Sequence, residues 1–159
     1  MLHFAYGSNM SRKLMRRHAP AAQPAGVARL PGYRFVITSD GYASVEPSVG
    51  DGVYGLLWRL TARDRVTLDA WENVAAGLYR PAMLPVLAEG RRRPALVYIA
   101  RPSHEGPAKP GYMELVIAAA REWEAPEPYV QSLRRWLPPR TKGNPPVFKG
   151  PSHKTGEFG

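Results

Sequence analysis

Residues 53–60 constrain the fold of this chain more than any other stretch of its sequence. They read VYGLLWRL, and all of them except Gly55 and Arg59 are hydrophobic. A short run of this composition is typical of a strand buried on both faces, so the chain must supply covering structure on each side of it. Gly55, in the middle of the run, predicts either a bulge or the close approach of another segment.

Further strands are predicted where short apolar runs are bounded by turn residues. They lie at residues 2–6, 33–38, 78–88 and 94–100. Pro81 and Pro85 cannot donate hydrogen bonds to a neighbouring strand, which places residues 78–88 at an edge or a bulge of the sheet. Residues 19–26 are predicted to form a loop, and residues 43–52 a turn-rich stretch with room for a short strand at its start.

Four segments are predicted to be helices, at residues 11–17, 62–73, 112–124 and 128–137. Ser8 or Asn9 is placed to cap the first of them, and Thr61 and Asp64 form a variant of the capping box at the start of the second. Helices and strands do not alternate regularly along the chain. This order indicates a mixed α+β fold rather than a parallel sheet built from βαβ units.

The positive charge of the chain is concentrated at its C-terminal end. The net charge is +9, and residues 134–159 contain six of the 22 Lys and Arg residues but one of the 13 acidic residues. Residues 1–137 are predicted to form one domain, and residues 138–159 a basic Pro- and Gly-rich tail that is wholly or partly disordered. Such a tail can attract nucleic acid, but we attribute its charge to solubility and expect no nucleic-acid partner.

The chain contains no cysteine, which excludes disulfides, thiolate nucleophiles and zinc–thiolate sites. The histidines are far apart and are expected at the surface, so neither a metal nor a cofactor is predicted. They are His3, His18, His104 and His153. No segment resembles a signal peptide or reaches the roughly 18 apolar residues of a membrane helix. These features predict a soluble, cytoplasmic protein.

Glu72 is the acidic residue with the most unusual neighbours. It lies near the end of the helix predicted at residues 62–73, after Trp71 and before the mostly apolar residues 74–79. Burial among apolar groups raises the pKa of a carboxyl group, and a raised pKa suits a group that accepts and returns a proton near neutral pH. Spacing alone favours the alternative, in which Glu72 is a helix-end glutamate in contact with solvent.

Tyr6, Gly7, Ser8 and Asn9 follow the first predicted strand. A glycine followed by backbone N–H groups at the start of a helix can bind an anion or a developing oxyanion. The alternative is an ordinary capping turn without a ligand. The stretch lacks the spacing of a phosphate-binding loop, and Ser8 lacks the second flanking glycine of a nucleophile elbow.

Three motifs, in this order, resemble the gamma-glutamylcyclotransferase-like family, also called AIG2-like. They are the Y-G-S-N tetrapeptide at residues 6–9, the V-Y-G-L-L-W strand at residues 53–58, and the L-D-A-W-E segment at residues 68–72 with Gly77 and Tyr79. The resemblance extends over residues 2–137 and includes Tyr112, which opens a helix after a Pro-rich loop. It implies a small mixed β-barrel with flanking helices, which is an α+β fold.

The resemblance also implies roles for particular residues. The Y-G-S-N tetrapeptide would border the cavity and bind a γ-glutamyl group through backbone donors, and Glu72 would be the catalytic acid and base. Tyr79 and Tyr112 would shape the pocket or hydrogen-bond the substrate, unless they are core tyrosines with satisfied hydroxyls. Arg80, Arg101 or Lys109 could pair with a substrate carboxylate, although each is expected as a surface charge.

The implied activity is that of a metal-independent γ-glutamylcyclotransferase, a transferase or an amidine-type lyase without a cofactor. The α-amine of a γ-glutamyl compound attacks its own γ-carbonyl and releases 5-oxoproline and a free amine or amino acid. Two alternatives keep the fold: a substrate among γ-glutamyl-amines or other conjugates, or a non-catalytic module that binds a small molecule. The leaving group, glutathione as a substrate, the role of the tail and the formation of a homodimer stay open.

Overall fold

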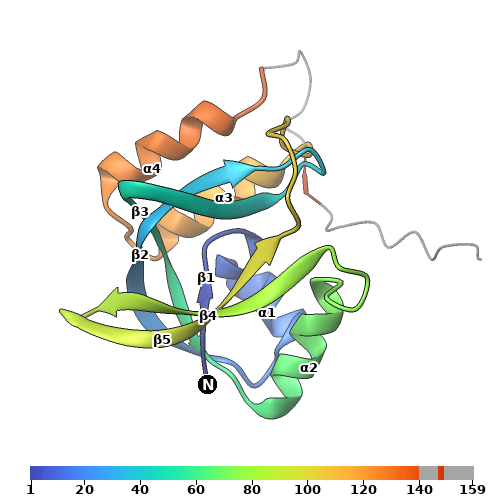
Figure 1. Cartoon of the computed structure of the whole chain (residues 1–159), viewed down its shortest axis with the longest axis vertical. Coiled ribbons are helices and arrows are strands. Elements are labelled where there is room, and N and C mark those ends of the chain that lie inside the picture. The colour runs from blue at the N-terminus through green and yellow to red at the C-terminus, as the bar shows by residue number, and fades with distance from the viewer. Residues whose placement is uncertain (140–146, 149–159) are drawn as a thin grey trace, which may run out of the picture.

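Five strands form a closed barrel in this computed structural model, which describes residues 1–139 and 147–148 (Figure 1). Around the barrel the strands follow the order β1, β3, β2, β4 and β5. Their bounds are Leu2–Ala5 for β1, Gln23–Ile37 for β2, Ala43–Arg59 for β3, Tyr79–Ala88 for β4 and Arg91–Ala100 for β5. The β1–β5 pair is parallel and the other pairs are antiparallel, so the predicted mixed barrel is confirmed.

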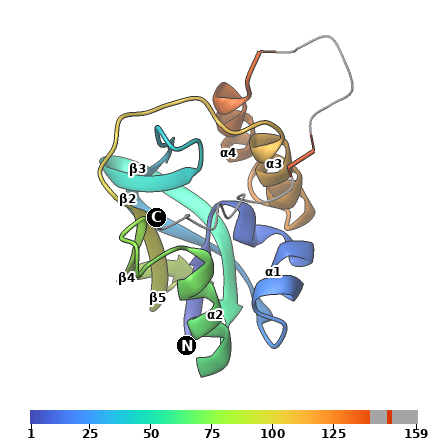
Figure 2. The same cartoon turned by 90° about the vertical axis from the view of Figure 1, so that its right-hand side faces the viewer.

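Within the described part of the chain, four α-helices and two short 3-10 helices flank the barrel. They are η1 (Ser8–Met10), α1 (Arg12–His18), α2 (Ala62–Trp71), α3 (Tyr112–Glu122), α4 (Glu127–Leu133) and η2 (Arg134–Trp136). Figures 1 and 2 show α3 beside α4 at one end of the molecule, away from α2. The helix predicted at residues 128–137 is thus divided into α4 and η2, and the other three end within a few residues of the predicted bounds.

The start of α2 has the capping box expected from the sequence. The Thr61 hydroxyl accepts a hydrogen bond from the Asp64 backbone N–H at 3.1 Å, and the Asp64 carboxylate accepts one from the Thr61 N–H at 3.2 Å. These two bonds satisfy N–H groups that have no partner inside the helix. They fix where α2 begins. Glu72 is the residue that caps its other end.

The hairpin of β2 and β3 is longer than predicted, and two expectations about it were wrong. Strand β2 begins inside the predicted loop at residues 19–26, and β3 runs without a break through the predicted turn-rich residues 43–52. The two strands pair from Gln23 with Arg59 to Ile37 with Ala43, interrupted by two register shifts. The strands continue through these Pro and Gly residues because cross-strand contacts outweigh local strand preference. Gly26, Gly32 and Gly50 have positive φ and lie at the two register shifts.

Strand β4 carries its two prolines because it is paired mainly on one side. It pairs with β5 from Tyr79 with Ala100 to Ala88 with Arg91. Its pairing with β2 consists of one registered pair, Arg29 with Leu87. The strand therefore belongs to the closed barrel yet leaves most of one side unpaired, as an edge strand does, which accommodates residues without an N–H donor.

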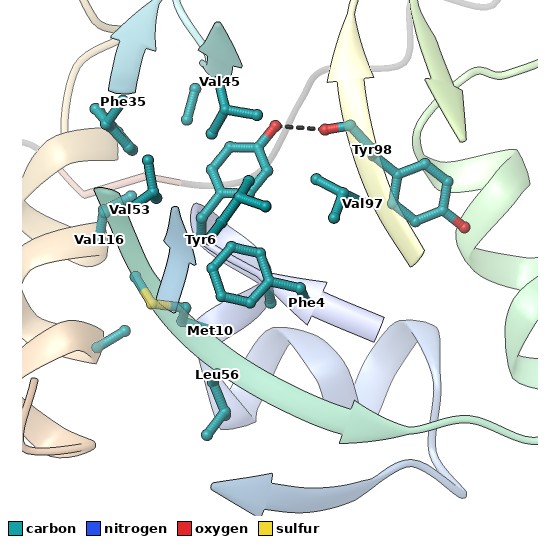
Figure 3. Close-up of a cluster of buried hydrophobic side chains, with 14 of the residues drawn as sticks. Phe4, Tyr6, Met10, Phe35, Val45, Val53, Leu56, Val97, Tyr98 and Val116 are labelled. Atoms are coloured by element: carbon teal, nitrogen blue, oxygen red, sulfur yellow. Dashed lines mark hydrogen bonds between the residues drawn. The ribbon is translucent and has the colours of Figure 1, made fainter. Parts of the chain in front are cut away.

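The interior of the barrel is filled by aromatic and aliphatic side chains from several strands. Figure 3 shows Phe4, Tyr6, Leu56 and Val97 within this cluster, and all are buried. A β-carbon on Gly55 would lie 2.3 Å from the carbonyl oxygen of Ala5 and 2.8 Å from the Phe4 ring. The close approach predicted at Gly55 is therefore confirmed, and it is the contact between β3 and β1.

No helix in residues 1–139 and 147–148 is long and apolar enough to cross a membrane. The division into a domain at residues 1–137 and a tail at residues 138–159 stays a prediction. Most of that tail, residues 140–146 and 149–159, lies outside the described residues.

Candidate active site

One pocket brings together all seven residues that the sequence indicated for a site. It lies where the end of β1, the residues after α2 and the start of α3 meet. These residues are Tyr6, Gly7, Ser8, Asn9, Glu72, Tyr79 and Tyr112. Their proximity is a property of the structure, whereas their roles in binding and catalysis stay predictions.

Glu72 caps the C-terminal end of α2, and its side chain is partly buried in the pocket wall. The side-chain amide of Asn9 donates a hydrogen bond to the Glu72 carboxylate at 2.9 Å. Burial raises the pKa of Glu72 to about 7, and the hydrogen bond from Asn9 offsets only part of this rise. Near neutral pH the carboxyl group is therefore populated in both its protonated and its ionised form.

A tight turn between α2 and β4 carries Glu72 and Tyr79 to the same pocket. Asn73 and Gly77 both have positive φ, of 51° and 74°, and the backbone carbonyl of Asn73 accepts hydrogen bonds from Ala76 and Leu78 at 3.2 Å. Glycine adopts such a conformation without steric cost. The spacing from Glu72 to Gly77 and Tyr79 is thus the length of chain that reverses direction between the helix and the strand.

Two tryptophan side chains hold the Y-G-S-N segment in place. The indole N–H of Trp58 donates to the carbonyl of Asn9 at 3.0 Å, and that of Trp123 donates to the carbonyl of Met10 at 2.8 Å. The two rings meet edge to face with 6.0 Å between their centroids. The sequence alone did not indicate these two contacts, because a single tryptophan carries no signal for the carbonyl that it will reach.

Gly7 lies against the Tyr112 side chain. A β-carbon at this position would be 2.8 Å from the Tyr112 hydroxyl and 3.3 Å from the β-carbon of Ala43. Real β-carbon contacts are longer than the first of these distances, so any larger residue would displace Tyr112 or the loop. The small residue in the tetrapeptide is therefore required by packing within the pocket.

Three tyrosine hydroxyls of the pocket, those of Tyr6, Tyr79 and Tyr112, bind backbone groups. Tyr79 donates to the carbonyl of Ala43 at 2.6 Å, and Tyr112 accepts from the N–H of Ala43 at 3.2 Å. Tyr6 donates to the carbonyl of Tyr98 at 2.5 Å, as the dashed line in Figure 3 marks. Burial raises the pKa of all three hydroxyls well above that of free tyrosine, so they are neutral at physiological pH.

His3 is a buried pocket residue that sequence reasoning missed. It was expected at the surface, but it is 2% exposed and lines the pocket. Its Nδ1 lies 3.0 Å from the carbonyl of Leu96 and is therefore the protonated nitrogen, while Nε2 has no hydrogen-bond partner among the described residues. Burial lowers the pKa of His3 to about 4, so the ring is a neutral acceptor. A lone histidine in a strand has no spacing pattern that would predict its burial in the wall of a pocket.

The pocket wall is nearly uncharged. Among the described residues that line it, Glu72 is the one carboxylate and none is Lys or Arg. Arg80, Arg101 and Lys109, which were considered as partners for a substrate carboxylate, do not line it. The same described ranges contain no group of three or more metal-ligating side chains.

Comparison with known proteins decides the family. The model of the AIG2-like family matches residues 52–133, about half of the chain. The chain belongs to the AIG2-like family. This match spans the second and third of the motifs on which the resemblance was based, including Glu72, Gly77 and Tyr79.

Relatives of this AIG2-like chain include proteins named gamma-glutamylcyclotransferase. The mouse protein is 28% identical, and the alignment covers 89% of this chain and 81% of the mouse protein. The human protein is 27% identical, and the alignment covers 84% of this chain and 77% of the human protein. A solved structure titled gamma-glutamyl cyclotransferase superposes with a TM-score of 0.84 at 26% identity, covering 94% of each chain. The fold and the family predicted from the motifs are confirmed.

Proposed function

We propose that this protein is a γ-glutamylcyclotransferase, which converts a γ-glutamyl compound into 5-oxoproline and a free amine or amino acid. The observation that carries the proposal is the pair of Glu72 and Asn9. A carboxyl group with a pKa of about 7 is hydrogen-bonded to the last residue of the Y-G-S-N segment, in one pocket. The relatives named gamma-glutamylcyclotransferase support the same activity.

The first step is the formation of the nucleophile. A γ-glutamyl compound enters with its α-amine protonated, and the ionised Glu72 accepts one proton from this ammonium group. Asn9 turns its side-chain N–H toward Glu72, and its side-chain oxygen Oδ1, which has no partner among the described residues, accepts a second ammonium N–H. Together these two acceptors orient the nitrogen that will attack.

The second step closes the ring. The neutral α-nitrogen attacks the γ-carbonyl carbon of the same molecule, and orientation of the chain supplies much of the acceleration because the attack is intramolecular. Backbone N–H groups between Gly7 and Asn9 stabilise the negative charge that develops on the carbonyl oxygen. The ring nitrogen carries two hydrogens after the attack and releases one of them to solvent. Glu72 then returns its proton to the leaving nitrogen, the bond from that nitrogen to the γ-carbon breaks, and 5-oxoproline and the amine depart.

A panel of substrates tests the proposal directly. The purified full-length chain is incubated with γ-glutamyl-amino acids, γ-glutamyl-amines and glutathione, and release of 5-oxoproline is measured by chromatography. Release from at least one class is expected. Binding of these compounds without release from any of them would instead support the alternative of a non-catalytic binding module.

The pH profile of the reaction is expected to follow the ionisation of the Glu72 carboxyl group. The ionised carboxylate is the active form of the base, and the pKa of about 7 means that its fraction falls as pH decreases through neutrality. We expect kcat/KM to be about 10-fold lower at pH 6 than at pH 8, since kcat/KM reports the ionisation of the free enzyme. A profile that is flat over this range, with circular dichroism showing an intact fold at pH 6, would contradict Glu72 as the base.

A further inference from the structure

The C-terminal segment contributes an aromatic ring to the pocket. Phe148 lines the pocket together with Tyr42 and Tyr112. Its ring centroid lies 5.2 Å from that of Tyr112 and 6.3 Å from that of Tyr42, in both cases edge to face. Tyr42 and Tyr112 meet in the same way at 5.5 Å. The three rings form a cluster in which each contacts the other two, an arrangement that favours one geometry over many.

A second hollow of the surface meets this cluster. It is lined by residues of α1 and α3, and Val147 and Phe148 line it as well. Phe148 therefore lines both the pocket and the hollow between α1 and α3. Its position is set by packing against helices as well as by the tyrosine rings, so the ring is a built part of the wall.

The walls of the pocket differ in chemistry. The polar groups suited to an ammonium group are Glu72 and Asn9, which are hydrogen-bonded to each other. Phe148 and Tyr42 add apolar ring surface, and none of the described lining residues is Lys or Arg. If the γ-glutamyl group binds at Glu72 and Asn9, the leaving group is the part of the substrate that meets this aromatic wall. The wall suits an uncharged, apolar leaving group and supplies no Lys or Arg to pair with a carboxylate on it.

We infer that Phe148, with Tyr42, contacts the leaving amine and makes this protein selective for γ-glutamyl compounds whose leaving amine carries an apolar group of aromatic size. The inference rests on the proposed function, because it names the substrate class of that same site. It assigns a binding role to a residue of the C-terminal segment that none of the family motifs contains.

Two substrates that differ by one ring test the inference. γ-Glutamyl-2-phenylethylamide and γ-glutamylmethylamide both release an uncharged primary amine after proton transfer, so the ratio of their kcat/KM values isolates the contact with the phenyl group. The wild type is expected to favour the phenylethylamide, and Phe148→Ala is expected to lower this ratio about 10-fold. Phe148→Tyr, which keeps the ring, is expected to restore it.

Val147→Ala is the matched control. Val147 is adjacent in sequence, is 78% exposed and does not line the pocket, so its ratio should equal that of the wild type. A purely structural effect of Phe148→Ala, such as loosening of Tyr112, would slow both substrates equally and leave the ratio unchanged. An unchanged ratio in Phe148→Ala overturns the inference while the release of 5-oxoproline still supports the proposed function.

Binding separates the two proposals if neither amide is cleaved. Calorimetric titration of both amides into Glu72→Gln protein, with and without Phe148→Ala, gives the ratio of dissociation constants without turnover. Selective binding that is lost with the ring supports the aromatic wall, and the substrate panel described above then decides the cyclotransferase activity. Absence of selective binding overturns the inference, whereas only failure of the whole panel overturns the proposed function.

Discussion

Replacing Glu72 with glutamine is expected to lower kcat for 5-oxoproline release by about 10²–10⁴-fold, the usual contribution of a positioned proton-transfer group. The glutamine carbonyl oxygen can still accept the hydrogen bond that Asn9 now donates to the carboxylate. It cannot take a proton from the substrate ammonium or return one to the leaving amine. The variant therefore removes the chemistry of Glu72 and preserves its shape and its contact with the Y-G-S-N segment.

The stability of Glu72→Gln should rise or stay unchanged, although its activity falls. Burial raises the pKa of Glu72, so the folded state favours the protonated form, and the stability that this provides is lost as pH rises through about 7. At pH 8 the neutral glutamine avoids the cost of a partly buried charge. The free energy of unfolding of Glu72→Gln in urea should thus be no lower than that of the wild type at this pH.

The control for this variant is Glu89→Gln, which makes the same chemical change at an exposed position in the turn between β4 and β5. Its kcat and stability should equal those of the wild type. If Glu72→Gln keeps kcat within about threefold of the wild type, the catalytic assignment fails. If it loses both activity and stability, the role of Glu72 is structural.

Much of the candidate site could be predicted because its residues are grouped in short motifs. Asn9 of the Y-G-S-N segment and Glu72 are 63 residues apart, and their motifs indicated a site only when taken together as a family resemblance. The structure joins them through one hydrogen bond. Local physics also fixed the start of α2, since Thr61 and Asp64 satisfy each other within four residues. A contact can be predicted from the sequence when it is local or when a known motif accompanies it.

The rest of the fold depends on contacts between distant residues that have no local signature. Strand β3 continues through Pro47, Gly52 and Gly55 because β2 pairs with them, and no short window of the sequence contains both strands. His3 is buried by β5, 93 residues away, and Phe148 meets the pocket through Tyr42 and Tyr112. Such residues look ordinary in sequence, and packing alone gives them their positions.

Gly55→Ala is expected to cost about 3 kcal/mol of unfolding free energy, at the upper end of the usual effect of overpacking. The added β-carbon would lie 2.3 Å from the backbone carbonyl oxygen of Ala5 and 2.8 Å from the Phe4 ring. Neither group can rotate away, because one is backbone and the other is enclosed by the core. The strands β1 and β3 must separate, and urea denaturation followed by circular dichroism measures the loss.

Gly52→Ala, in the same strand, controls for the loss of chain flexibility. There the added β-carbon would meet the guanidinium group of Arg29, the far end of a flexible side chain that can move at little cost. We expect a change below about 1 kcal/mol, because surface substitutions of this kind have small effects. Equal losses of unfolding free energy in the two variants would show that the clash at Gly55 is not the cause of the loss.

The Gly55→Ala molecules that do fold should also have a lower kcat than the wild type. Strand β1 leads directly into the Y-G-S-N segment, and Trp58 of β3 holds the carbonyl of Asn9. A displacement of β1 relative to β3 therefore changes the position of Asn9 and of the carboxylate that it contacts. Because misplacement of reacting groups by about 1 Å can cost about 10²-fold in rate, kcat per folded molecule should fall while Gly52→Ala keeps it.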